Sequence, residues 1–282
     1  MPGINADWEE ITPKYEHLQN ILMDMKEVLV AFSGGTDSTF LLKVAKNVLK
    51  EKVLAVTALS ETVPKHEKAD AHTFARAFDV QHVWINSEEL KDPDFIKNPT
   101  DKCYICKKLR FGELVRMART KGIPWVADGE NEDDKTDYRP GSIAARELGV
   151  RSPLREAGLT KAQIRFISKE LNLPSWNKPS CACLASRIPY HQPITAQKLR
   201  QVDEAEAFIR TIDLSRQVRV RHEGDTARIE VDIENIHKFM GTHVRKQIVT
   251  KFKSLGFKFI ALDLEGYSTG SLNPSLLKNQ GE

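Results

Sequence analysis

The sequence predicts an α/β protein: a Rossmann-like parallel sheet followed by a smaller C-terminal α+β domain. Three observations predict it. Apolar runs of strand length alternate with helical patterns in the first half of the chain, a glycine-rich turn joins the first run to a helix, and the pattern changes from Thr195 onward. The 282 residues are enough for two cores, so we expect domains at 1–190 and 191–282.

The first domain contains the alternating pattern. Strands separated by helices imply right-handed crossovers and parallel pairing. Ligands of such sheets bind at the carboxyl ends of the strands, where residues 33–38 and Asp128 fall. The expected strands are 27–32, 52–58, 80–85 and 124–128, and the expected helices are 13–25, 39–49, 64–78, 107–121, 142–148 and 160–171.

The second domain follows a proline-bracketed segment, 174–193, which we interpret as a functional loop and hinge. We expect an antiparallel sheet there, with residues 223–225 as a hairpin turn. The basic residues between Arg216 and Arg221 alternate with valines, which indicates the solvent-facing side of a strand. The expected strands are 217–222, 226–231 and 257–262, and the helices are 195–212, 233–240 and 243–255.

The turn after the first strand reads Ser33-Gly34-Gly35-Thr36-Asp37-Ser38. Its glycines let backbone N–H groups approach an anion, and the following helix N-terminus favours negative charge. Ser33 and Ser38 add hydroxyl donors, while Asp37 suits a magnesium ion better than a phosphate. The pattern lacks the Gly-Lys-Ser/Thr ending of the common P-loop and is not the dinucleotide fingerprint. The alternative is an ordinary glycine turn.

An acidic segment follows the fourth predicted strand, from Asp128 to Asp134, and Asp137 lies just beyond it. Carboxylates at a strand end suit Mg²⁺ beside a triphosphate, although a solvated acidic loop is the alternative. The next residues, Arg139-Pro140-Gly141, present a cation on a rigid turn. This cation suits an acidic substrate.

The cysteines form two close pairs, for which four chemical interpretations stay open. They suit a four-cysteine zinc site or a [4Fe-4S] cluster held by three of them. One cysteine can instead be a nucleophile, because Lys178 and Arg187 near Cys181 would favour its thiolate. Buried cysteines without a chemical role are the fourth interpretation. The pairs are Cys103 with Cys106 and Cys181 with Cys183.

Composition narrows the classes of partner. Lys and Arg number 42 against 39 Asp and Glu, a balance that argues against a nucleic-acid partner. The sequence has no apolar stretch of membrane-spanning length and no export-signal pattern at its start. We therefore expect a cytoplasmic protein without a membrane partner.

Five stretches together resemble one known family. The chain is similar to the LarE-type ATP-dependent sacrificial sulfur transferases (pyridinium-3,5-bisthiocarboxylic acid mononucleotide synthases). These belong to the N-type ATP pyrophosphatases, or PP-loop enzymes, of the adenine nucleotide alpha hydrolase superfamily. The glycine-rich turn alone is shared across that superfamily, and the later stretches narrow the resemblance. The stretches are 31–38, 103–107, 137–141, 184–190 and 262–270.

The resemblance implies an activity with ATP and Mg²⁺ as cofactors. The enzyme would adenylate a carboxylate of pyridinium-3,5-biscarboxylic acid mononucleotide and replace oxygen by sulfur, during synthesis of the nickel-pincer nucleotide of lactate racemase. Rival functions are tRNA thiolation and a zinc-stabilised nucleotide-binding regulator without turnover. We also expect a homo-oligomer.

The resemblance also assigns site residues. Cys181 occupies the sulfur-donor position, while Cys103, Cys106 and Cys183 are the trio for a [4Fe-4S] cluster that would carry sulfide instead. Residue chemistry, apart from the resemblance, suggests four candidates for contacts with the substrate phosphate or a metal, each with an ordinary surface residue as the alternative: Arg187, Glu230, Arg245 and Asp263. Of these, Glu230 and Asp263 are taken as metal ligands. The ATP- and substrate-binding set is Ser33, Gly34, Gly35, Asp37, Ser38, Asp128, Arg139 and Arg187.

Overall fold

The structure, a computed structural model, describes residues 8–135 and 140–268. Internal contacts divide the chain into two compact units. Unit 1 comprises 1–60, 65–89 and 101–180, and unit 2 comprises 61–64, 90–100 and 181–282. The sequence-based boundary after residue 190 stays a prediction.

Unit 1 is built on a four-stranded sheet in the order β3-β2-β1-β4, and every pairing is parallel. This confirms the predicted α/β class and the parallel sheet. Because the strands are parallel, the loops after β1 and β4 leave the same edge of the sheet from neighbouring positions. The strands are β1 (Val28–Ala31), β2 (Val53–Leu59), β3 (Gln81–Asn86) and β4 (Trp125–Ala127).

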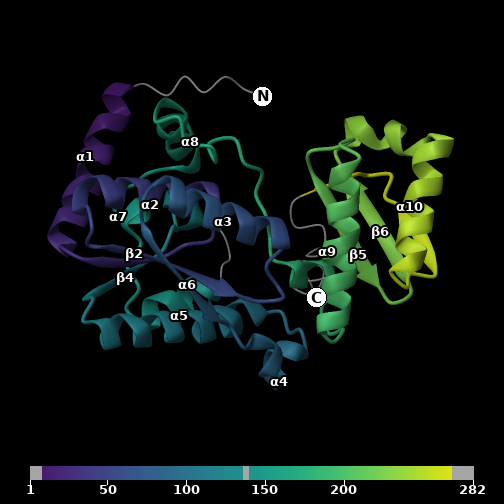
Figure 1. Cartoon of the computed structure of the whole chain (residues 1–282), viewed down its shortest axis with the longest axis horizontal. Coiled ribbons are helices and arrows are strands. Elements are labelled where there is room, and N and C mark those ends of the chain that lie inside the picture. The colour runs from purple at the N-terminus through teal and green to yellow at the C-terminus, as the bar shows by residue number, and fades with distance from the viewer. Residues whose placement is uncertain (1–7, 136–139, 269–282) are drawn as a thin grey trace, which may run out of the picture. The chain divides into compact units, whose positions relative to one another are not determined.

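Helices cover both faces of this sheet (Figure 1). On one face pack α1 (Trp8–Met25), α2 (Thr36–Leu49), α3 (Lys65–Ala77), α7 (Pro153–Glu156) and α8 (Lys161–Glu170). On the other pack α5 (Lys102–Lys121) and α6 (Pro140–Glu147). Short elements that the sequence did not predict are α4 (Pro93–Ile96) and the 3₁₀ turns η1 (Glu89–Lys91) and η2 (Glu132–Lys135), besides α7.

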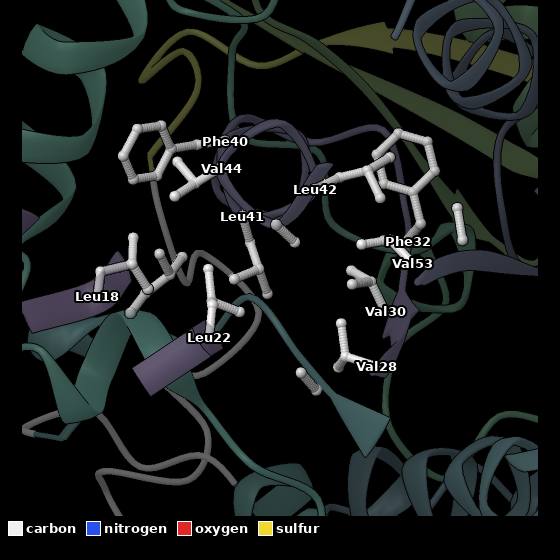
Figure 2. Packing of buried hydrophobic residues seen from close by; sticks show 14 of the residues in the cluster. Leu18, Leu22, Val28, Val30, Phe32, Phe40, Leu41, Leu42, Val44 and Val53 are labelled. Carbon is white, nitrogen blue, oxygen red and sulfur yellow. The ribbon is translucent and has the colours of Figure 1, made fainter. Parts of the chain in front are cut away.

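Helix α2 is the element that carries the glycine-rich turn, and it is held firmly. Figure 2 shows Phe40, Leu41 and Val44 of α2 facing Leu18 and Leu22 of α1. All five side chains are fully buried. The helix begins at Thr36, three residues earlier than predicted, so Asp37 and Ser38 lie in its first turn. A helix anchored in this way presents its N-terminus at a fixed place.

Unit 2 contains a three-stranded sheet in the order β5-β6-β7. The predicted hairpin is confirmed, since β5 and β6 pair antiparallel. The prediction of a wholly antiparallel sheet is wrong, because β7 pairs parallel with β6 after a crossover through α10. The elements are η3 (Leu184–Arg187), α9 (Ala196–Thr211), β5 (Val218–Glu223), β6 (Thr226–Val231), η4 (Ile233–Met240), α10 (Thr242–Ser254) and β7 (Phe259–Leu262).

Strand β5 corrects a second prediction. Arg219 and Arg221 were expected to face solvent, but each is only 5% exposed. Arg221 forms a bidentate ion pair with the buried Glu230 of β6, and Arg219 lies 5.1 Å from the centre of the Tyr267 ring. Alternating valine and arginine therefore marks a strand that is buried on both faces. Within the described residues, no helix has the length and apolar character needed to cross a membrane.

Candidate active site

The glycine-rich turn closes on itself through short polar contacts. The Ser33 and Ser38 hydroxyl oxygens lie 3.0 Å apart, and the Gly35 N–H donates to Ser33 Oγ at 3.3 Å. Gly35 is the N-cap of α2, and no side chain caps the helix there. The first-turn amides of α2 and two hydroxyls thus meet at one helix end, an arrangement suited to phosphate oxygens.

Two glycines allow the backbone to pack as closely as it does. Gly34 has a φ of +73°, and a Cβ on it would lie 2.9 Å from the Ala71 backbone nitrogen of α3. A Cβ on Gly129, after β4, would lie 2.9 Å from the Ser38 nitrogen. The loop that follows Asp128 therefore rests against the first turn of α2, next to Asp37.

Asp37 is mostly buried, and only one of its two carboxylate oxygens has hydrogen-bond donors among the described residues. Its Oδ2 accepts from Lys161 Nζ and from Asn131 Nδ2, both at 3.4 Å. Its Oδ1 is buried and has no hydrogen-bond partner among the described residues. Burial raises the pKa of Asp37 above its ordinary value, although the Lys161 ammonium opposes this.

Asp128 repeats this arrangement at the end of β4. Its Oδ1 accepts from Ser152 Oγ at 2.8 Å and from the Glu130 N–H at 3.2 Å, whereas Oδ2 is buried and unpartnered in the described part of the chain. Burial raises the pKa of Asp128 to about 6, with Lys107 opposing the shift. A buried carboxylate oxygen without a donor is costly. The two orphaned oxygens, on residues beside the glycine-rich turn, fit a divalent cation with oxygen ligands.

The rest of the acidic segment is bound within the protein. Glu130 accepts from Lys107 Nζ at 2.8 Å, from Ser142 Oγ at 2.6 Å and from Arg155 Nη1 at 2.9 Å. These donors hold its pKa below the usual value in spite of burial. Glu130 therefore fixes the loop that bears Asp128. Arg139 and Asp137 lie outside the described residues, and their predicted roles stay predictions.

The cysteine pairs belong to different units. Cys103 and Cys106 lie one helical turn apart at the start of α5 in unit 1, so they share a face. Cys181 and Cys183 belong to unit 2 and are half-buried. None of the four forms a disulfide. Cys103 and Cys106 lie in unit 1 and Cys183 lies in unit 2, so neither unit by itself contains the three predicted cluster ligands. The [4Fe-4S] site therefore stays a prediction.

Arg187 holds the loop that carries Cys183. It is fully buried and forms a bidentate pair with the equally buried Glu206 of α9, with Nε–Oε1 at 2.7 Å and Nη2–Oε2 at 3.2 Å. Its Nη1 donates to the carbonyls of Ala182 and Cys183 at 3.0 and 3.2 Å. Glu206 keeps the pKa of Arg187 above its ordinary value although burial opposes this. The geometry gives Arg187 a positioning role, and its predicted phosphate contact stays a prediction.

Glu230 and Asp263, the predicted metal ligands, are bridged by one arginine. Arg228 Nη1 lies 2.9 Å from Glu230 Oε1 and also pairs with Asp263. Arg221 Nη2 approaches Glu230 Oε2 at 2.6 Å, and its Nη1 donates to the Ser186 carbonyl at 2.8 Å. The charges of both carboxylates are thus balanced by arginines, and metal binding there stays a prediction.

Sequence reasoning missed several residues that shape the site. Lys161 and Asn131 hold Asp37, Ser152 holds Asp128, and Glu206 holds Arg187. Asn131 lies in the loop directly after β4, so its position in the chain was a usable signal, whereas Ser152 is separated from Asp128 by 24 positions and lies between two helices. Lys161 and Glu206 offered none, because an exposed helix face carries the same residue types.

Comparisons with known proteins find a family model that matches part of the chain and relatives that match nearly all of it. A model of the NAD synthase family matches residues 9–96. A pyridinium-3,5-bisthiocarboxylic acid mononucleotide synthase of Lactiplantibacillus plantarum is 38% identical over 261 residues, which cover 92% of this chain and 93% of the relative. Uncharacterised proteins of Synechocystis and Methanocaldococcus jannaschii are 41% and 30% identical, over 94% and 86% of this chain and 98% and 91% of theirs.

Proposed function

Because the chain belongs to the LarE family of PP-loop ATP pyrophosphatases, we propose that it adenylates a carboxylate of pyridinium-3,5-biscarboxylic acid mononucleotide and converts it to a thiocarboxylate. One observation carries the proposal. Two buried carboxylate oxygens without donors, Asp37 Oδ1 and Asp128 Oδ2, belong to residues beside an uncapped helix N-terminus that is lined by two serine hydroxyls. This set of groups fits Mg²⁺ and the phosphates of ATP.

In the first step, the first-turn amides of α2 and the hydroxyls of Ser33 and Ser38 bind the pyrophosphate end of ATP. Asp37 and Asp128 would hold the Mg²⁺, which when bound neutralises phosphate charge and favours departure of pyrophosphate. The substrate carboxylate attacks the α-phosphorus, and an acyl-adenylate forms as pyrophosphate leaves. The carboxylate, a poor electrophile, has then gained AMP as a leaving group.

In the second step, sulfur replaces oxygen. The Cys181 thiolate attacks the acyl carbon and AMP leaves, which gives a thioester. Loss of the Cys181 Cα proton and cleavage of its Cβ–Sγ bond release the thiocarboxylate and leave dehydroalanine. Arg187 supports this step because it donates to the Ala182 and Cys183 carbonyls and so fixes the backbone next to Cys181. In the alternative, Cys103, Cys106 and Cys183 would hold a [4Fe-4S] cluster, which when bound would supply the sulfide, and Cys181 would not be consumed.

The remaining assignments complete the proposal. Arg139 and Arg187 are kept as contacts for the substrate's acidic groups, and Glu230 and Asp263 as metal ligands. The reaction would occur twice per nucleotide, in the cytoplasm, during nickel-pincer nucleotide synthesis, with the enzyme as a homo-oligomer. The balanced net charge of the chain, +3, supports a small-molecule substrate over tRNA.

The test uses anaerobically purified protein with ATP, Mg²⁺ and the mononucleotide. We expect pyrophosphate release that depends on the mononucleotide and is abolished by Asp128→Asn. Absence of release from the wild-type protein contradicts the proposal. Mass spectrometry then separates the sulfur sources, since loss of H₂S at Cys181 supports sacrifice. An intact Cys181 after turnover, with stoichiometric iron and sulfide, supports the cluster.

A further inference from the structure

We propose that Lys178 is a positioning residue that locks the pyrophosphate-binding turn to the segment leading to the cysteines, so that ATP binding orders that segment. The inference rests on the proposed use of the turn for ATP, and it adds a coupling between adenylation and the sulfur-donating part of the chain. The residues that carry it all belong to unit 1.

The Lys178 ammonium has three acceptors for its three donors. It donates to the Gly34 carbonyl at 3.1 Å and to Glu67 Oε2 of α3 at 3.0 Å, and it lies 2.7 Å from Asp70 Oδ2 of the same helix. Its side chain is only 13% exposed. Although burial opposes it, contacts with His66 and Lys178 lower the pKa of Glu67, so the carboxylate stays charged at neutral pH. The lysine therefore joins two elements at one point.

The position of the Gly34 carbonyl matters to the anion site. The carbonyl and the Gly35 N–H belong to one planar peptide unit, so fixing one fixes the other. That N–H donates to Ser33 Oγ and opens the row of amides at the start of α2. Gly34 adopts a positive φ against the backbone of Ala71, and Ala71 follows Asp70 directly in α3. Lys178 thus holds the turn in the conformation that presents its donors.

The segment that bears Lys178 has further anchors on the same unit. Thr36 Oγ1, in the first turn of α2, donates to the Ser175 carbonyl at 2.9 Å. Arg165 of α8 donates to the Lys178 carbonyl at 2.7 Å. The Trp176 and Lys178 amides donate within the segment, to the carbonyls of Leu173 and Ser175 at 3.1 and 3.0 Å. Cys181 follows Lys178 by three residues.

The consequence follows from thermodynamic linkage between ATP binding and the conformation of the segment that bears Lys178. If Lys178 stabilises the ATP-binding form of the turn, then ATP stabilises the locked form of the segment by the same factor. ATP is therefore expected to order the backbone just before Cys181 as the carboxylate is activated.

The test measures Mg²⁺-ATP binding by calorimetry and hydrogen exchange of the Trp176 and Lys178 amides, with and without ATP. In the wild type we expect ATP to slow this exchange about fivefold. Lys178→Met should raise the ATP Kd about tenfold, the effect of losing a hydrogen bond from a charged group, and abolish the protection. Asp70→Asn, a milder change at a half-buried acceptor, should shift both the ATP Kd and the protection in the same direction. The control is Lys169→Met, which removes an exposed lysine 5.4 Å from the Trp176 ring centre and should change neither.

Circular dichroism confirms that each variant is folded. Either of two results for folded Lys178→Met overturns the inference: an ATP Kd within twofold of wild type, or ATP protection that persists in this variant. Tighter ATP binding by Asp70→Asn also overturns it, because a lysine that bound phosphate directly would be released by that change. A wild-type protein that binds no ATP would instead overturn the proposed function.

Discussion

The glycine-rich turn offers a matched pair of substitutions that separates backbone strain from steric contact. Gly34 and Gly122 both have a φ of +73°. A Cβ on Gly34 would meet the backbone of Ala71, whereas a Cβ on Gly122 has nothing within 4 Å. Both substitutions therefore introduce backbone strain, but only Gly34→Ala also introduces a steric collision.

The expected magnitudes follow from this difference. An alanine at positive φ costs about 1–2 kcal/mol, and this applies to both variants. In Gly34→Ala the new Cβ would lie 2.9 Å from the nitrogen and 3.0 Å from the Cα of Ala71. Ala71 lies within α3, where the helix hydrogen bonds resist a local shift of the backbone. Overpacking of this kind costs about 1–3 kcal/mol more. Because the turn must move to relieve it, Mg²⁺-ATP affinity should fall about tenfold in Gly34→Ala and stay unchanged in Gly122→Ala.

Calorimetry measures both quantities on the same samples. Each kcal/mol should lower Tm by about 2–4 °C, so the Gly34 variant should unfold several degrees below the Gly122 variant. Equal Tm values together with equal ATP affinities would refute the reasoning. They would mean that the turn tolerates a side chain at Gly34.

Three further outcomes are expected. Since folding raises the pKa of Asp128 from 3.8 to about 6, the contribution of Asp128 to the stability of the metal-free protein should fall as pH rises through that interval, and its contribution to Mg²⁺ affinity should fall as pH drops below about 6. The difference in Tm between wild type and Asp128→Asn, and the difference in their Mg²⁺ affinities, should therefore change with pH in these directions; differences that do not change with pH would contradict the shift. Arg187→Met leaves the buried Glu206 without its bidentate partner and should cost about 3–5 kcal/mol in urea unfolding, whereas a loss below about 1 kcal/mol would contradict the role of the pair. Cys181→Ala should still release pyrophosphate but form no thiocarboxylate; thiocarboxylate formed by this variant would exclude Cys181 as the donor.

The geometry of the glycine-rich turn could be predicted because its signal is local. Two glycines between serines, placed between a buried strand and a helix, specify amide and hydroxyl donors through backbone geometry alone. The position of Asp128 followed from a rule of similar simplicity, because parallel strands end at one edge of the sheet. In the structure the loop after Asp128 does contact the first turn of α2, through Gly129 and Ser38.

The partners of these groups could not be predicted, because they are distant in sequence. Lys178 and Gly34 are separated by 144 positions, and Lys161 and Asp37 by 124. A lysine on a helix or loop has the same local pattern whether it faces solvent or a buried carboxylate. The arginines of β5 could not be placed for the same reason. Their alternation with valines indicated a solvent-facing side of the strand, but Arg221 is buried because Glu230 on the neighbouring strand pairs with it.

Local pattern was thus sufficient for the α/β class, the order of the elements, the glycine-rich turn before α2 and the acidic residue at the end of β4. Tertiary structure decided which charges are buried, which carboxylate oxygens lack donors, and that β7 runs parallel to β6. The reason is physical. Backbone conformation depends on neighbouring residues, whereas the protonation and reactivity of a side chain depend on the charges and the exclusion of water that folding brings around it.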